Sequence, residues 1–204
     1  MKREFKVLAI VLYMMFLCIF LGACGNSENA YFKGQYLYMD GTEYVEATGL
    51  YKESNTIIGK TGDDYTIYEV DGDSEHNYIV LRSFFDQTLY VRKNYIKDKT
   101  VIEALCFNQN KSKFVYDESF IDIFIKELLE DESTVEIDNK SLMSYRKTGI
   151  DVYVKYANDS VSEYCGSVIY DGSKYLYFNA QNSTTILVNE KTKKMLAELE
   201  ILKK

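Results

Sequence analysis

The sequence of 204 residues contains no proline, no tryptophan and a single histidine, His76. A serine or cysteine nucleophile needs a base, and His76 is the only histidine that could serve, yet it lies in the polar segment 73–77, which is typical of a turn. Zinc would need several histidine or cysteine ligands, and those present are scattered singly. No glycine-rich nucleotide motif occurs, and Gly166-Ser167 lacks the second glycine of a nucleophile elbow. The sequence therefore predicts no catalytic residue, no metal ligand and no cofactor.

Basic residues are also scarce, with 24 Lys and Arg against 31 Asp and Glu and a net charge of −7. Nucleic acids and anionic lipid surfaces both attract basic proteins, so neither is expected to bind this chain through charge. The acidic segment 71–75 has oxygen ligands two residues apart, as a calcium loop does. The twelfth position of such a loop is Arg82 here, so we interpret 71–75 as a solvated turn, and likewise Asp63-Asp64.

The longest hydrophobic run, Val7 to Leu21, follows three basic residues in the first six positions. At about 1.5 Å per residue this run spans about 22 Å as a helix, short of the roughly 30 Å hydrocarbon core of a bilayer. It fits the hydrophobic region of a signal peptide better than a permanent membrane helix. Two small residues, Gly22 and Ala23, then precede Cys24, as a signal-peptidase pocket requires.

The stretch Leu21-Gly22-Ala23-Cys24 resembles the lipobox of bacterial lipoproteins, a resemblance that covers residues 1–24 only. It implies a signal peptide at 1–23, cleavage before Cys24 and acylation of the Cys24 thiol, with a lipidated tether at 24–34. Two or more acyl chains hold a protein stably at a membrane. The resemblance implies a lipid-anchored protein on the extracytoplasmic face of the cell membrane. A plain secretory peptide or an uncleaved anchor helix is the alternative.

Cleavage would leave a folded, acidic body. Lys2, Arg3, Glu4 and Lys6 precede Cys24, so 21 basic and 30 acidic residues remain, a net charge of −9. Of the 19 tyrosines, 18 follow Cys24. Tyrosine combines a flat apolar ring with a polar tip, which suits both the outer face of a sheet and contact with a protein or glycan ligand.

Strand patterns dominate the body. Asp40-Gly41 and Asp171-Gly172 each separate two tyrosine-rich runs, as in β-hairpins whose turns need positive φ angles. The first hairpin is expected to start the fold, with strands at 36–39 and 42–45. Further strands are expected at 56–59, 65–70, 78–83, 88–92, 100–107, 150–156, 161–170, 175–178 and 184–188. The fold class predicted is α+β and β-dominated, with antiparallel hairpins forming a small barrel or a sandwich.

One amphipathic helix is expected at 119–130, with Ser119 as its N-cap and an apolar face of Ile121, Phe124, Ile125 and Leu128. The tail from residue 190 reads either as a second helix, which we favour, or as a hairpin. The polar segment 108–113 is the expected boundary between a β-rich half at 35–107 and an α+β half at 113–204; the alternative is that both pack as one body.

Two cysteines remain in the body, Cys106 and Cys165. They could form a disulfide in an exported protein, or stay buried as small hydrophobic residues. For function, the sequence favours a binding module at the cell envelope over a hydrolase that uses paired carboxylates. A pocket holding two close carboxyl groups, one with a raised pKa, would favour the hydrolase.

Overall fold

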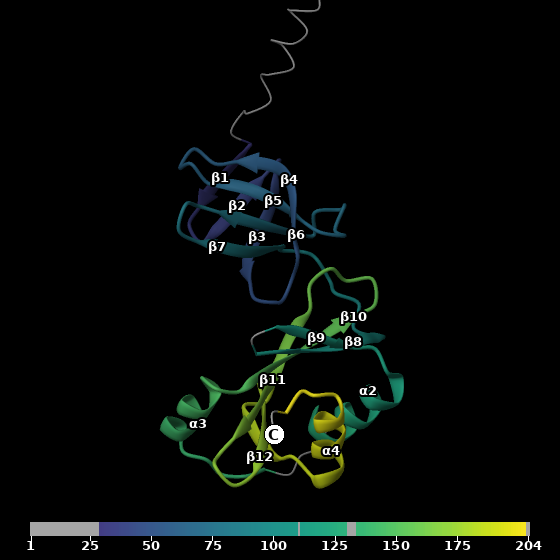
Figure 1. The fold of residues 1–204 in the computed structure, drawn as a ribbon. Helices are drawn as coiled ribbons and strands as arrows, with labels where there is room; N and C mark the ends of the chain where they lie inside the picture. The colour runs from purple at the N-terminus through teal and green to yellow at the C-terminus, as the bar shows by residue number, and fades with distance from the viewer. Residues whose placement is uncertain (1–28, 110, 130–133, 203–204) are drawn as a thin grey trace, which may run out of the picture.

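The structure is a computed structural model, and it describes residues 29–109, 111–129 and 134–202. Antiparallel strands dominate and helices are few, which confirms the predicted β-dominated α+β class. Figure 1 shows one sheet in the N-terminal half of the chain and a second sheet, accompanied by helices, in the C-terminal half. The expected signal peptide at 1–23, with Leu21, Gly22 and Ala23, and the expected lipidation site Cys24 lie outside the described residues.

The first sheet has seven strands in the order β1-β2-β3-β7-β6-β5-β4. The predicted tether was too long, because four of its residues form β1, which pairs with β2 and so belongs to the sheet. The short run Ala-Tyr-Phe-Lys carries no clear alternation of apolar and polar residues, so the sequence does not predict a strand there. The strands are β1 (Ala30–Lys33), β2 (Tyr36–Met39), β3 (Thr42–Ala47), β4 (Glu53–Lys60), β5 (Thr66–Val70), β6 (Tyr78–Arg82) and β7 (Gln87–Arg92).

This sheet curls into a half-barrel, and its two edge strands meet at a seam. Ala30 forms a parallel bridge with Thr61. The Asn29 side chain donates to the Ile58 carbonyl oxygen at 3.2 Å and accepts from the Lys60 amide at 3.1 Å. The interior holds mostly aliphatic side chains and two tyrosines: Ala30, Leu37, Met39, Tyr44, Ile67, Ile79, Leu81 and Tyr90. Curling therefore buries one face of the sheet without a helix.

Both predicted Asp-Gly hairpins are present, with different turns. Asp40 and Gly41 have φ angles of 49° and 78° and form a two-residue turn between the paired residues Met39 and Thr42. Around Gly172, which has a φ of 98°, the turn is longer. The Asp171 carboxylate accepts there from the backbone amides of Ser173 and Lys174, each at 2.9 Å.

The second sheet has six strands in the order β13-β12-β11-β10-β8-β9. Asn108 pairs with Ser112, and Phe107 with Lys113, between β8 and β9, so the predicted boundary lies inside this sheet; the chain passes between the two sheets at residues 93–101 instead. Polar residues suit a hairpin turn and a linker equally, so composition could not tell the two apart. The strands are β8 (Ile102–Asn108), β9 (Ser112–Val115), β10 (Ile150–Tyr156), β11 (Glu163–Tyr170), β12 (Tyr175–Asn179) and β13 (Thr184–Leu187).

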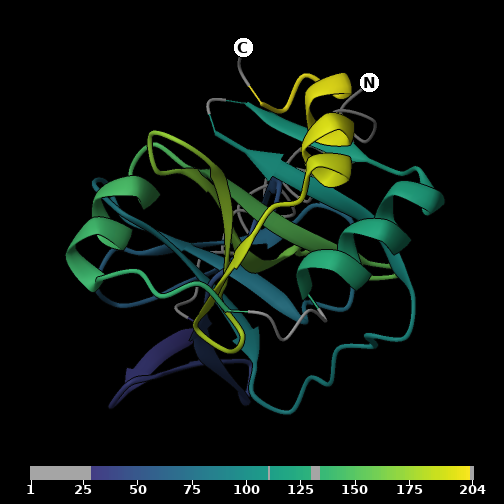
Figure 2. The ribbon, with the colours of Figure 1, turned by 90° about the horizontal axis from the view of Figure 1, so that it is seen from below.

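Helices lie on both sides of the second sheet. Figure 2 shows α2 (Glu118–Phe124) and α4 (Glu190–Glu198) together on one side and α3 (Asn139–Arg146) on the other. The π-helical turn η1 (Ile125–Leu129) continues α2. The largest buried cluster contains Phe120, Phe124, Leu128 and Leu196 from these helices, so the apolar faces read from the sequence do pack against the sheet.

The predicted helices differ from the observed ones at their ends. The N-cap of α2 is Asp117, which accepts from the Phe120 amide at 2.7 Å, and the predicted cap Ser119 instead donates its hydroxyl to Asp117. The tail is helical, as favoured, and begins where the Asn189 side chain accepts from the Thr192 amide at 2.8 Å. Both caps are short polar side chains, as helix N-termini prefer.

The two halves are in contact along the outer face of β6. Alternate residues of that strand are buried on opposite sides: Ile79 faces the interior of the first sheet, whereas Tyr78 and Val80 pack against Val161 from the second half. A bridge between Leu50 and Ser162 adds backbone hydrogen bonds in both directions.

Candidate functional site

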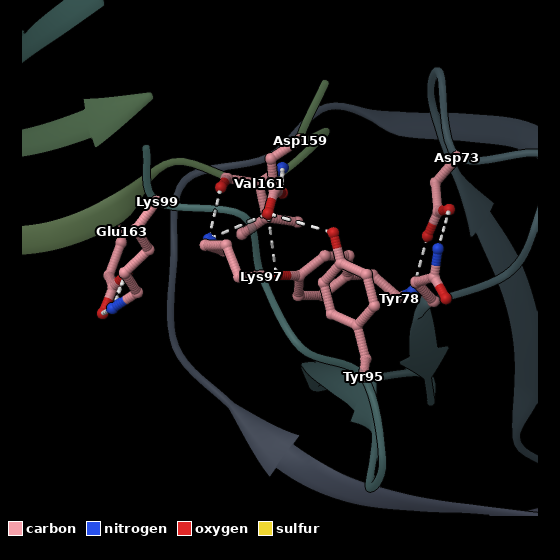
Figure 3. A network of polar contacts seen from close by, with 9 residues as sticks. Asp73, Tyr78, Tyr95, Lys97, Lys99, Asp159, Val161 and Glu163 are labelled. Atoms are coloured by element: carbon pink, nitrogen blue, oxygen red, sulfur yellow. Dashed lines mark hydrogen bonds and ion pairs between the residues drawn. The ribbon is translucent and has the colours of Figure 1, made fainter. Parts of the chain in front are cut away.

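A buried ion pair joins the halves at this contact (Figure 3). The side chain of Asp159, between β10 and β11, is only 2% exposed and lies 3.3 Å from the Lys97 ammonium. It also accepts the hydroxyls of Tyr78 and Tyr95, each at 3.4 Å, and the Val161 amide at 2.8 Å. Lys97 donates to the Val161 carbonyl oxygen at 3.0 Å. We call these five residues the junction network.

The junction network offers no reactive group. Burial, reinforced by the Asp159 charge, raises the pKa of Tyr95 to about 12 and also raises the pKa of Tyr78. Both hydroxyls therefore stay protonated at neutral pH and act as donors. The Asp159 carboxylate is surrounded by donors, three of them side chains of the first half and the linker. It therefore serves to hold the two halves together.

A small polar hollow of about 280 Å³ adjoins the network, between the loop at 72–77 and Ser160. The buried Asp73 carboxylate there accepts the Tyr78 amide at 2.5 Å and the Asn77 side chain. This loop contains the acidic segment considered above for calcium. Across the described ranges, no group of three or more His, Cys, Asp or Glu side chains is placed to hold a metal ion. The Asp73 carboxylate oxygens instead accept hydrogen bonds that hold the loop in shape.

A larger cleft, of about 480 Å³, opens beside α2. Its floor is aliphatic, with Ile121 buried and Ile102 and Ile125 half-buried. Two exposed side chains border it: Val101, which is 57% exposed, and Tyr116, which is 59% exposed. We call it the α2 cleft, and its lining is Lys99, Thr100, Val101, Ile102, Glu103, Tyr116, Glu118, Ile121, Asp122 and Ile125.

Charges at the α2 cleft leave a local excess of carboxylate. Lys99 is engaged with Glu163 at 2.8 Å, and Glu103 with Lys155 at 2.8 Å. Within the described ranges neither Glu118 nor Asp122 has an ion-pair partner. They stand four residues apart on α2, which places them on the same side of the helix. The cleft therefore combines an apolar floor with two uncompensated negative charges.

Four carboxyl groups have a pKa that departs from its ordinary value, and in each of them the pKa is lowered. Hydrogen bonds lower the pKa of Asp98, Asp117, Glu127 and Asp171. A general acid in a hydrolase needs a carboxyl whose pKa is raised. These four carboxyl groups therefore do not suit the role of general acid.

The two body cysteines do not form the candidate disulfide: Cys106 and Cys165 are both free and buried. Cys165 belongs to the same buried cluster as Leu105 and Phe107, so Cys106, between those two on β8, points to the opposite face of the sheet. Strand β10 also separates their strands. Burial raises the pKa of the Cys165 thiol to about 12, which leaves it protonated and unreactive.

Ser167 takes part in a hydrogen-bond chain that sequence reasoning missed. It donates to Asp151 at 2.7 Å and lies 2.7 Å from the Tyr164 hydroxyl, which accepts from Arg146 of α3 at 3.1 Å. Ser167 is fully buried, so no substrate reaches its hydroxyl. This row of hydrogen bonds connects α3 to the sheet. Asp151 and Ser167 come together only because β10 pairs with β11.

His76 and the exposed tyrosines form no common site. His76 lies in the loop before β6, as expected for a turn, and its Nε2 is 3.7 Å from a Glu69 carboxylate oxygen. The most exposed described tyrosines are Tyr31 on β1, Tyr116 directly after β9, and Tyr170 at the end of β11.

Comparison with protein-family models, curated proteins and solved structures found nothing that matches this chain. In the described ranges, none of the helices has the length and apolar character needed to cross a bilayer.

Proposed function

We propose that this chain is a lipid-anchored protein of the bacterial cell envelope, held by Cys24 on the extracytoplasmic face of the membrane, and that its body binds a basic peptide segment of a partner in the α2 cleft. The pattern Leu21-Gly22-Ala23-Cys24 supports the anchor. The cleft supports the binding role.

The observation that carries the binding role is the pairing of an isoleucine floor with the free carboxylates of Glu118 and Asp122. Lysine and arginine have apolar stems that cover hydrophobic surface while their charged heads reach polar groups. The stem of such a residue fits the floor, and its head meets the carboxylates. At about 480 Å³ the cleft also falls within the roughly 300–1,000 Å³ of ordinary ligand sites.

A basic peptide suits this cleft better than a glycan. Sugar rings pack on flat aromatic faces, and Tyr116 is the single aromatic residue of the lining. The three isoleucines present branched aliphatic surface instead, which complements aliphatic side chains. The acidic balance of the whole chain, at −7, further favours a cationic partner.

The anchor is tested by Cys24→Ala in cells. We expect the variant to leave the membrane fraction, because the acylated thiol is lost. Unchanged membrane fractionation, or a mature protein that retains residues 1–23, contradicts lipid anchoring.

The cleft is tested by calorimetry with a short peptide of alternating lysine and leucine. Glu118→Gln/Asp122→Asn should weaken binding at least about tenfold, because both carboxylates that meet the lysine ammonium are lost. A tenfold change in affinity corresponds to about 1.4 kcal/mol. The matched control, Glu198→Gln/Glu200→Gln, removes the same charge from the exposed end of α4 and should change affinity less than about twofold.

Equal losses in the two double variants would show that only net charge matters and would contradict a site at α2. A peptide with glutamate in place of lysine should not bind. If lysine amide alone binds as tightly as the peptide, the cleft takes a small amine and the peptide proposal is wrong.

A further inference from the structure

The first sheet leaves several large apolar side chains exposed, among them two consecutive phenylalanines. Within its described strands and turns, the large hydrophobic residues that stay exposed are Tyr31 and Phe32 on β1, Ile57 on β4, and Phe84 and Phe85 between β6 and β7. Strands β1 and β4 meet at the seam. Phe84 and Phe85 are each 92% exposed, the highest values of any large hydrophobic residue described. Isolated exposed apolar residues are ordinary, but an adjacent pair of bare phenylalanines is not.

The turn that carries the two rings is held in shape by its own hydrogen bonds. The Ser83 amide donates to the Asp86 carbonyl oxygen at 2.8 Å. The Ser83 hydroxyl oxygen accepts the amides of Phe85 at 3.2 Å and Asp86 at 3.0 Å. The rings of Phe84 and Phe85 contact each other edge to face, 4.7 Å between centroids, and the exposed fractions show that nothing else covers them. We call residues 83–86 the phenylalanine tip.

The phenylalanine tip lies at the end of the sheet where the chain enters. Ala30 bridges to Thr61, and the Thr61 amide donates to the Tyr65 carbonyl oxygen across the β4–β5 turn. The next residue, Thr66, pairs with Arg82, directly before the tip. Three strand spacings of about 4.8 Å therefore separate the start of β1 from the start of the tip, or about 15 Å along the sheet.

The proposed anchor brings this same end to the membrane. Cys24 precedes Asn29 by five residues, which span at most about 18 Å when fully extended. A body held this closely cannot keep its point of attachment far from the lipid. The phenylalanine tip, about as far from the seam as the anchor can reach, is thus within range of the bilayer surface.

We infer that this end of the first sheet rests on the membrane and that Phe84 and Phe85 enter its interfacial region, an inference that rests on the proposed lipid anchor. Aromatic side chains favour the boundary between headgroups and acyl chains. Asp63, Asp64 and Asp86 lie in the turns at this end and remain in the headgroup layer, so insertion is shallow. Because the chain is acidic, the contact depends on apolar side chains and not on anionic lipid.

The absence of tryptophan makes the test direct, since any introduced tryptophan is the sole one in the protein. Full-length lipidated Phe84→Trp and Phe85→Trp are reconstituted on phosphatidylcholine vesicles with and without brominated acyl chains. The control is Tyr170→Trp, at an exposed position of the second sheet. We expect brominated lipid to quench both tip variants at least about twofold and to leave the control unchanged.

Vesicle flotation distinguishes the lipid anchor at Cys24 from the membrane contact of the phenylalanine tip. If the protein floats but the tip tryptophans are unquenched, the membrane-facing role of the tip is overturned and the anchor stands. A blue-shifted tip emission without bromine quenching also overturns it, because a second copy of the chain then covers the rings. If the protein does not float, the anchor itself fails and the inference falls with it. Unaltered thermal unfolding of each variant shows that the tip still folds.

Discussion

The two sheets bury their apolar residues by different means. The first curls until its edge strands meet at Asn29, so that one face becomes an interior, and the described chain places no helix there. The second stays open and relies on α2, η1 and α4 to cover one face. The curled sheet depends on the pairing of β3 with β7, which are far apart in the sequence, whereas α2 and α4 each follow directly after a strand of the sheet that they cover.

This difference separates the proposed roles. The curled sheet exposes the phenylalanine tip at the end where β1 starts, whereas the helix-covered sheet has the α2 cleft, lined by α2 and residues 99–103. The junction network connects them, since Tyr78 belongs to the first half and Asp159 to the second. Disconnecting the halves, or weakening one sheet at a time, tests whether the two sheets are separate units.

The largest effect is expected from Asp159→Ala. It leaves the Lys97 ammonium, 12% exposed, without its counter-ion, and removing one partner of a buried pair costs about 3–5 kcal/mol. We expect calorimetric unfolding to separate into two transitions, one for each sheet. Asp71→Ala, which breaks the exposed Lys52–Asp71 pair, is the control and should cost less than about 1 kcal/mol. Similar losses from both variants would show that the junction network does not couple the halves.

A smaller loss, of about 2–3 kcal/mol, is expected from Gly166→Ala in the second sheet. A Cβ at Gly166 would lie 2.1 Å from the Phe178 carbonyl oxygen and 2.5 Å from the Tyr177 hydroxyl, so β12 must move. Hydrogen exchange should speed up in β11 and β12 and stay unchanged in the first sheet. Protection lost equally in both sheets would mean that they unfold as one unit.

In the first sheet, Gly41→Val should cost about 1 kcal/mol or more. Gly41 has open space around it but a φ of 78°, which a β-branched residue adopts only under strain. Chemical denaturation provides the measurement, with Gly172→Val as the counterpart in the second sheet, at φ of 98°. Unaltered unfolding midpoints for both would contradict the conformations of these turns.

The smallest effect is expected from alkaline pH, which should lower the free energy of unfolding by deprotonating Tyr95 in the junction network. Tyr95 titrates near 10 in an unfolded chain, and in the folded protein its pKa is raised to about 12. Its contribution to stability is complete below about pH 10 and is lost as the pH rises towards about 12, because the unfolded chain then binds fewer protons than the folded one. Denaturation by urea at about pH 9 and about pH 11 should show a smaller drop for Tyr95→Phe than for the unaltered chain. An equal drop would place the alkaline sensitivity elsewhere.

Local signals explain what the sequence could predict. Asp-Gly pairs gave both hairpins, and periodic apolar residues gave α2 and α4, because turn chemistry and helix faces are encoded within a few neighbours. Even the error at Ser119 is local. Asp117 and Ser119 are both good N-caps, and the sequence alone does not rank two caps placed two residues apart.

The remaining features depend on pairs far apart in the sequence. Asn29 sits in a polar run that reads as a tether, and only its contacts with Ile58 and Lys60 reveal the seam. Lys97 and Asp159 are ordinary surface residue types until the halves meet. The α2 cleft depends likewise on which side of the helix faces residues 99–103. The candidate site therefore could not be predicted from the sequence, because the net charge of the chain does not show where its carboxyl groups gather.

The position of Asn29 bears on how long such a protein would stay at the cell surface. With Cys24 acylated, only residues 25–28 separate the lipid from the seam. Proteases grip extended substrate on both sides of the bond that they cut, and so short a stretch offers them little to hold. Shedding of an intact body into the medium would first require β1 to peel away from its neighbours, so turnover should proceed through unfolding and not through clipping at the surface.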